Sequence, residues 1–130
     1  MNVQLPSGHT APLEPAGLAR LLSCGGTITG LCRAVLAHPE LEPEHLAAAS
    51  PDDALAVASW ALEEFLATDE AAELAAVCER FGQSPAQRLG ICDRTLAFHV
   101  DQGCVMALER FKDAHKPDEP RGFNAGDING

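Results

Sequence analysis

The feature that most constrains the fold is an apolar repeat with helical spacing in the last third of the sequence. Five apolar residues recur at intervals of three or four positions: Leu96, Val100, Cys104, Leu108 and Phe111. This spacing places them on one face of a helix. Asp93 stands just before the repeat, where its carboxylate can accept hydrogen bonds from the free amides of a first helical turn. The sequence therefore predicts a long helix that packs through a single stripe.

Shorter helices with capping signals precede this long helix. Ser84-Pro85 starts a short turn that Gly90 ends. Pro15 suits the first position of an earlier helix, which ends at Gly25-Gly26. We expect that helix to present a face of three leucines: Leu18, Leu21 and Leu22. Thr27 then caps a second short helix, which ends at residues 38–39, and residues 43–49 form one further helical turn.

The middle of the chain begins a longer helix. Ser50, Pro51 and Asp53 supply a capping hydroxyl, a proline at the first position and an acid near the positive end of the helix dipole. One side of this helix, which runs to about residue 67, carries Leu55, Ala58, Leu62, Phe65 and Leu66. Val57 and Trp60 lie towards the other side. We therefore expect this helix to pack on more than one neighbour, or to offer one face to a partner.

Another helix is predicted for residues 69–81. Thr68 is placed to cap its start, and Gly82 is placed to stop it. We expect four of its residues to face inward: Leu74, Val77, Cys78 and Phe81. The loop to the next helix is short, which favours antiparallel stacking of neighbouring helices.

The first residues predict a β-hairpin. Residues 3–5 and 10–13 flank the turn sequence Pro6-Ser7-Gly8-His9, and Pro12 confines its strand to a sheet edge. A lone hairpin is marginally stable in water, so it must lie on the helices. The predicted fold class is mainly α: a small helical bundle with an N-terminal β-hairpin at 1–14, a helical domain at 15–115 and a flexible C-terminal tail at 116–130.

The net charge of −10 comes from the middle of the chain. Residues 34–79 include eleven acidic side chains and no Lys or Arg. Phosphate contacts need cations, so direct binding to nucleic acid is not expected. A basic protein partner fits this block, and so does a solvated acidic face that keeps the protein soluble. No run approaches the ~20 apolar residues of a membrane span. The first residues also lack the basic and apolar segments of a secretory signal. We expect a cytoplasmic protein that does not bind membranes.

Reactive side chains are present without the spacing of a catalytic or metal site. The five cysteines form no CxxC pair and are expected to be structural thiols: Cys24, Cys32, Cys78, Cys92 and Cys104. His99 and Cys104 are five positions apart, which places them on different helix faces. Cys92 precedes a helix start, but no catalytic motif surrounds it. The sequence Asp127-Ile128-Asn129-Gly130 lacks the other ligands of a calcium loop. We expect no enzyme activity, no catalytic residues, no metal and no cofactor.

Two stretches resemble small tail-assembly proteins of long-tailed bacteriophages and prophages. The first is Val3-Gln4-Leu5-Pro6-Ser7-Gly8-His9-Thr10 with the later Leu18-Ala19-Arg20-Leu21-Leu22, which resembles their "LPSG" start. The second runs from Ser84-Pro85 through Arg88-Leu89-Gly90-Ile91 and Asp93-Arg94-Thr95-Leu96-Ala97-Phe98 to Leu108-Glu109-Arg110-Phe111. It is similar to "P…LLGI.D..LA" in companion proteins from the same gene region. The resemblance implies a helical chaperone without an active site, which keeps the tape-measure protein soluble and recruits tail-tube subunits.

The sequence thus predicts a non-enzymatic phage or prophage tail-assembly chaperone in the bacterial host cell. Its expected partner is a phage structural protein, the tape-measure or tail-tube protein, and self-association is possible. The predicted contact residues are Val57, Trp60, Glu63 and Glu64, because they combine an apolar helix face with acidic side chains. Two alternatives stay open: a small acidic phage inhibitor that binds a basic host protein, and a structural virion subunit of the connector or tail.

Overall fold

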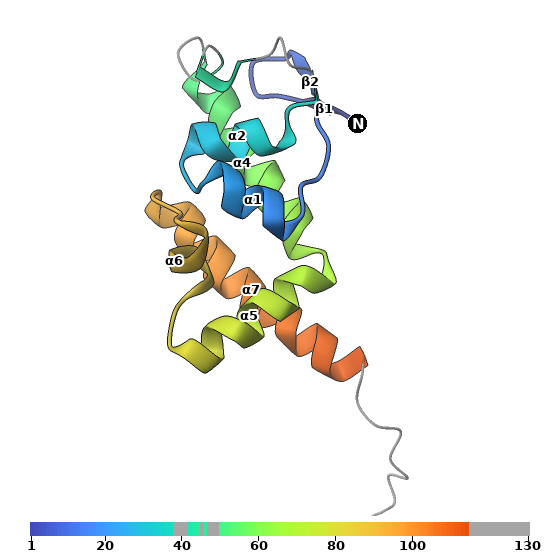
Figure 1. The fold of residues 1–130 in the computed structure, drawn as a ribbon. Coiled ribbons are helices and arrows are strands. Elements are labelled where there is room, and N and C mark those ends of the chain that lie inside the picture. Colours follow the sequence, from blue (N-terminus) through green and yellow to red (C-terminus); the bar gives the residue numbers. More distant parts are fainter. Residues whose placement is uncertain (38–41, 45, 47–49, 115–130) are drawn as a thin grey trace, which may run out of the picture.

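The computed structural model describes residues 1–37, 42–44, 46 and 50–114. These residues form a mainly helical fold with an N-terminal hairpin, which confirms the predicted fold class (Figure 1). The helix α4 (Pro51–Leu66) lies beside α2 (Ile28–Val35), which in turn contacts α1 (Leu18–Cys24). A second group contains α5 (Asp69–Phe81), α6 (Pro85–Leu89) and α7 (Arg94–Ala114), with α5 and α7 crossing each other. The predicted tail at 116–130 lies outside the described residues.

The hairpin pairs β1 (Asn2–Gln4) with β2 (Thr10–Pro12) in antiparallel register, with Val3 opposite Ala11. The first predicted strand (3–5) extended one residue further into the turn, and the second (10–13) extended one residue beyond Pro12. Leu5 is instead part of the turn, where its N–H donates to the carbonyl of His9 (2.8 Å) and its side chain is buried. Beyond β2, Leu13 forms a bridge with Leu36 at the end of α2. The hairpin therefore lies on the helices, as a marginally stable element requires.

Of the two short N-terminal helices, α2 starts where the sequence predicts and α1 does not. Thr27 caps α2 as predicted, since its hydroxyl accepts a hydrogen bond from the N–H of Gly30 (3.0 Å). The start predicted at Pro15 is wrong, because α1 begins at Leu18. There the first N–H donates to the Glu70 carboxylate of α5 (3.0 Å), so a side chain from another helix defines this end. The second helix was predicted to run to residues 38–39, but α2 ends at Val35 and Leu36 already has an extended backbone. Most of the turn predicted at 43–49 lies outside the described residues.

The long central helix α4 starts as predicted, and four of the five residues predicted to face inward are buried. The Ser50 hydroxyl accepts from the N–H of Asp53 (3.4 Å), and Pro51 is its first residue. The buried residues recur at steady helical spacing: Ala54, Val57, Ala58, Ala61, Leu62, Phe65 and Leu66. Leu55, predicted to face inward, is exposed, whereas Val57 is fully buried. The alanines complete the stripe, and their small side chains allow close packing against α2.

The helix α5 has the predicted bounds, but half of its predicted inward face is exposed. Gly82 ends it in the left-handed conformation (φ 67°), which suits glycine. Thr68 occupies the capping position, yet its hydroxyl donates to the carbonyl of Phe65 (2.6 Å) and accepts no hydrogen bond from α5. Val77 and Phe81 are exposed, so their predicted burial is wrong. The buried face consists of Ala71, Ala72, Leu74, Ala75 and Cys78.

The predictions for α6 and α7 are confirmed. Ser84 and Gln87 form a reciprocal capping box at the start of α6, and Gly90 ends it with φ 74°. The Asp93 carboxylate accepts from the N–H of Leu96 (2.9 Å) at the start of α7. Of the predicted stripe, Leu96, Val100 and Cys104 are buried, and Leu108 and Phe111 are partly buried against the core.

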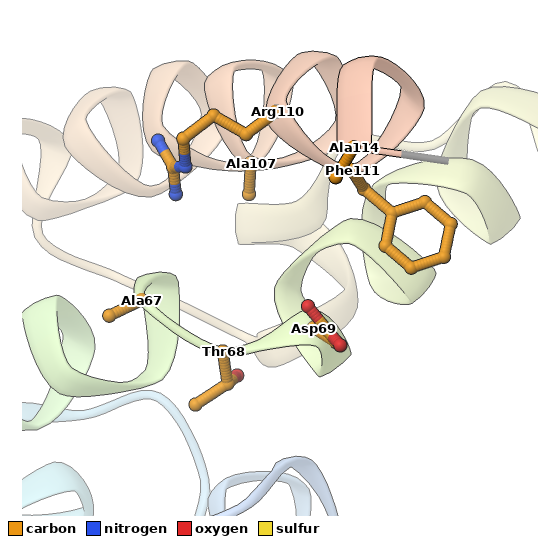
Figure 2. Close-up of a pocket in the computed structure, with 7 residues that line it drawn as sticks. All are labelled: Ala67, Thr68, Asp69, Ala107, Arg110, Phe111 and Ala114. Carbon is orange, nitrogen blue, oxygen red and sulfur yellow. The ribbon is translucent and has the colours of Figure 1, made fainter. Parts of the chain in front are cut away.

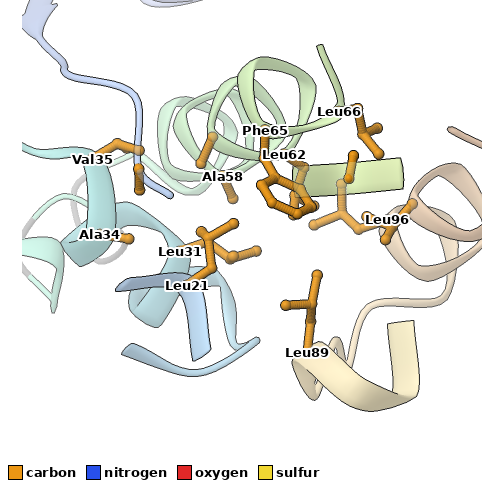
Figure 3. Packing of buried hydrophobic residues seen from close by; sticks show 14 of the residues in the cluster. Leu21, Leu31, Ala34, Val35, Ala58, Leu62, Phe65, Leu66, Leu89 and Leu96 are labelled. Atoms are coloured by element: carbon orange, nitrogen blue, oxygen red, sulfur yellow. The ribbon is translucent and has the colours of Figure 1, made fainter. Parts of the chain in front are cut away.

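One hydrophobic cluster connects the two groups of helices. Figure 3 shows Leu21 and Leu31 facing the side chains of Leu62 and Phe65, with Leu89 and Leu96 approaching from the α6–α7 side. The helices α4 and α7 approach closely at Gly103, where an added Cβ would lie 2.5 Å from Leu66 Cδ1. The core is therefore continuous from the hairpin to α7.

Candidate protein-binding surface

Of the two apolar residues in the predicted contact surface on α4, one is buried in the core. Val57 has no exposed surface and belongs to the core, so it cannot contact a partner without rearrangement of α4. The predicted inward face included Ala58 but left out Ala54 and Ala61, which are buried together with Val57. Trp60 is partly buried and packs against the core, so only part of its ring is accessible.

The two acids predicted for this surface lie next to each other at the end of α4. Glu63 is exposed, and its Oε2 lies 3.9 Å from Nε2 of His99 on α7. Glu64 is partly buried. The contact is an ion pair only when His99 is protonated, and an ion pair this exposed contributes little to stability. What remains of the predicted surface is a partly covered indole with two carboxylates, and its role in binding stays a prediction.

Larger exposed apolar side chains lie on α5 and α7. On α5, Phe81 is 74% exposed, and Val77 lies one turn before it on the same face. On α7, Phe98 is 69% exposed and Val105 is 59% exposed, seven positions further along the same face. Met106 is 56% exposed on a neighbouring face of α7. The exposure of these α7 residues could be predicted from the sequence, because they fall outside the predicted apolar stripe.

A hollow of about 260 Å³ lies beside Val105, between α5, α7 and the start of α6. Its apolar walls come from Ala75, Cys78, Pro85, Val105 and Leu108. Glu79, Glu109 and Lys112 add charged groups, and Gln83 completes the lining. This combination of apolar walls with charged residues suits an apolar side chain of another protein.

A second hollow, of about 200 Å³, lies where the α4–α5 junction meets the C-terminal end of α7 (Figure 2). Arg110 and Phe111 line it from α7, and Thr68 and Asp69 line it from the junction. Arg110 Nη2 donates to the carbonyl of Leu66 (3.1 Å), so this guanidinium caps the end of α4. The arrangement stabilises a helix end with a side chain from another helix.

A serine, a histidine and an aspartate meet where the hairpin turn reaches the start of α4. The carboxylate of Asp53 accepts from the N–H of Ser7 (3.0 Å) and from its hydroxyl (2.5 Å), and Ser7 Oγ lies 3.0 Å from His9 Nδ1. In a catalytic triad the carboxylate orients the imidazole, whereas here it binds the serine. These bonds, with the Ser7 hydroxyl first, lower the pKa of Asp53 below its ordinary value. The sequence did not predict this cluster, which fastens the hairpin to α4.

Three of the five cysteines are packing residues as predicted, whereas Cys24 is partly buried and Cys92 is exposed. Cys32, Cys78 and Cys104 are buried, and all five thiols are free. Burial raises the pKa of Cys32 to about 11 and that of Cys104 to about 12, so both stay protonated and unreactive near neutral pH. Within the described residues, no group of three or more His, Cys, Asp or Glu side chains is placed to hold a metal ion.

No protein-family model matches the chain, and no curated protein or solved structure is significantly similar to it. Among the helices that the structure describes, none combines the length and the apolar character needed to cross a bilayer.

Proposed function

We propose that this protein is a non-enzymatic assembly chaperone of a phage or prophage tail, which binds the tape-measure or tail-tube protein. The proposal rests on the resemblance of the stretches around Ser7 and Gly90 to tail-assembly proteins. The observation that best supports a protein-binding role is the exposure of Phe81, together with Val77, on one face of α5. An exposed aromatic side chain is a common anchor of protein interfaces.

The charge around this face is consistent with a chaperone. Glu73 and Glu79 of α5 are exposed, as are Asp69 and Glu70 in its first turn. Acidic side chains keep a protein with exposed apolar residues soluble. They also disfavour nonspecific contact with nucleic acid during assembly. The helix α5 thus combines an apolar anchor with four exposed carboxylates and one exposed base, Arg80, and is suited to cover an apolar, partly basic helix of a structural protein.

The test is affinity capture of the tagged full chain from the lysate of its own phage-bearing or prophage-bearing cells, with washes at low and high salt. We expect mass spectrometry to identify the tape-measure or tail-tube protein after the high-salt wash, because apolar contacts tolerate salt. Phe81→Ala should weaken this binding by at least about tenfold, as loss of an interface anchor does. Recovery of neither structural protein would contradict the proposal.

A matched control is Leu22→Ala, which removes an exposed apolar side chain from α1 (44% exposed), outside the α5 face. It should leave capture unchanged. Charge reversal of Glu63 and Glu64 tests the α4 surface separately, and unchanged binding would remove that surface from the proposal.

The block of eleven acids favours one other function, an inhibitor of a basic host protein. That interface would depend on charge, so its partner should be lost in the high-salt wash. Recovery of one basic host protein at low salt only would therefore favour the inhibitor over the chaperone.

A further inference from the structure

The outward face of α7 carries a self-complementary set of side chains. Arg94, Phe98, Val105 and Glu109 are spaced by four, seven and four residues, so they share one face of the helix. All four are exposed, whereas the buried residues of α7 lie on the opposite side. Their positions are symmetric about the midpoint between residues 101 and 102. A two-fold axis at that point would place each apolar residue against an apolar one and each charge against its opposite.

We infer that this face binds a second copy of the same chain, with the two α7 helices antiparallel. In this register, Arg94 of one copy lies opposite Glu109 of the second copy, and Phe98 lies opposite Val105. The symmetry repeats both pairs, as in any interface with two-fold symmetry. Within the described part of the chain, no hydrogen bond or ion pair engages the charged groups of Arg94 and Glu109. Both are therefore available for the pairing.

The hollow beside Val105 gives each phenyl ring a place to bind. Val105, Leu108 and Glu109 line the hollow from α7, so the ring of Phe98 from the second copy would lie at its mouth. The volume of about 260 Å³ accommodates a phenyl ring between the walls of Pro85 and Leu108. Lys112 lines the same hollow and can place its ammonium over the ring face. Burial of this ring removes the largest exposed apolar side chain of α7 from water.

The small size of the outward face of α7 limits the affinity that we expect for the dimer. A helix of 21 residues is roughly 30 Å long, and one helix pair with two seated rings is a small interface. We therefore expect a dimer in the micromolar range, with mass action favouring the monomer at lower concentrations. This inference does not rest on the proposed function, because it concerns α7 and needs no tail protein.

The test is sedimentation equilibrium of the purified full chain over a range of concentrations, in reductant so that the exposed Cys92 forms no disulfide. We expect Phe98→Ser to abolish dimerisation. The matched control is Met106→Ser, which removes a similarly exposed side chain of α7 outside the contact face and should leave the dimer unchanged. Circular dichroism of each variant checks that the helical content is retained.

Charge exchange tests the register. Arg94→Glu or Glu109→Arg alone should weaken the dimer by about tenfold, because each creates two like-charge pairs. The double variant Arg94→Glu with Glu109→Arg should restore wild-type affinity, because it re-forms both pairs in reverse. A wild-type chain that stays monomeric up to millimolar concentration would overturn the inference. So would a dimer that tolerates Phe98→Ser, or single-variant losses that the double variant does not recover.

Discussion

Gly26 allows two backbone segments to touch where the α1–α2 connection meets the end of α6. A Cβ at this position would overlap the carbonyl of Gly90 and lie 2.5 Å from the N atom of Ile91. Backbone atoms cannot move aside as a flexible side chain can. We expect Gly26→Ala to lower the free energy of unfolding by roughly 1–3 kcal/mol, the typical effect of overpacking. Urea unfolding followed by circular dichroism measures this change.

The matched control is Ser23→Ala in the adjoining α1, which alters an exposed side chain of similar size. Such a change normally stays within about 0.5 kcal/mol. Equal stability of the Gly26→Ala variant and the wild type would show that the close approach of the two segments is not needed for folding.

Asp53 makes the docking of the hairpin sensitive to acid. The hydrogen bonds from Ser7 lower the pKa of this carboxyl in the folded protein below its ordinary value of 3.8. A lowered pKa means that the stabilisation is present above the ordinary value and is lost as the pH falls through the folded value. We expect the loss of stability below pH 3.8 to be smaller in Asp53→Asn than in the wild type. Thermal unfolding measured between neutral pH and pH 2 gives both curves.

Asp52 provides the comparison for this pH dependence, because it is the exposed neighbour of Asp53 in the first turn of α4. Asp52→Asn should lose as much stability at acidic pH as the wild type does. If the two variants lost the same stability at acidic pH, the Ser7 contact would not be the source of the lowered pKa of Asp53.

At the scale of elements, charged side chains of one helix bind the ends of another. Arg20 of α1 donates from Nε to the carbonyl of Ala34 near the end of α2 (2.7 Å). Glu70 of α5 accepts from the first N–H of α1, and Asp101 of α7 accepts from the N–H of Ala86 in α6 (2.8 Å). Each bond satisfies a backbone group that the helix itself leaves free. The helix ends therefore depend on tertiary contacts as well as on local caps.

This dependence predicts the effect of removing one such side chain. Asp101→Ala should destabilise the protein by roughly 0.5–2 kcal/mol, as the loss of a capping side chain does. Hydrogen exchange should increase first at the amides of α6, because Asp101 binds its N-terminal turn. Gln102→Ala, at the exposed next position, serves as the control. Unchanged exchange in α6 would show that the Ser84 capping box alone holds this helix.

Local signals in the sequence located most helix ends, but they did not determine all buried faces. Thr27, Ser50, Ser84 and Asp93 each accept the hydrogen bond expected of a cap. The start of α1 was missed because its partner, Glu70, lies 52 positions away in the sequence. The buried faces of α4 and α5 were predicted only in part, because alanine is buried where close helix contact requires a small residue. Large apolar residues alone then define the buried face incompletely.

The candidate surfaces were less predictable than the fold for the same reason. A residue is predicted to be exposed when it falls outside the stripe that is predicted to be buried. The incomplete buried stripe of α4 therefore led to the wrong prediction that Val57 is exposed. The error on α5 placed Phe81 inside. The outward face of α7 followed correctly from a stripe that contains few alanines. The hollow beside Val105 needs residues from α5, α6 and α7 together, and no local pattern brings these together.

At the scale of the whole molecule, the two groups of helices share one core. Phe65 of α4 is fully buried in the cluster that also includes Leu31 of α2 and Leu96 of α7. A small protein with one continuous core normally unfolds in a single transition. The hairpin, α4 and α7 should therefore lose structure together. Separate unfolding of α5–α7 would require a gap in the core between the two groups of helices. The packing around Phe65 is continuous across both groups.

Phe65→Ala tests this cooperativity. Removal of a fully buried phenyl ring should cost about 3–5 kcal/mol, because apolar contacts are lost and a cavity remains. The fluorescence of Trp60 reports on α4, and far-ultraviolet circular dichroism reports on all helices. We expect the two urea midpoints to coincide in the wild type and to fall together in Phe65→Ala. A circular dichroism transition that divides into two steps, with only one matching Trp60, would show that α5–α7 unfold independently of the core around α4.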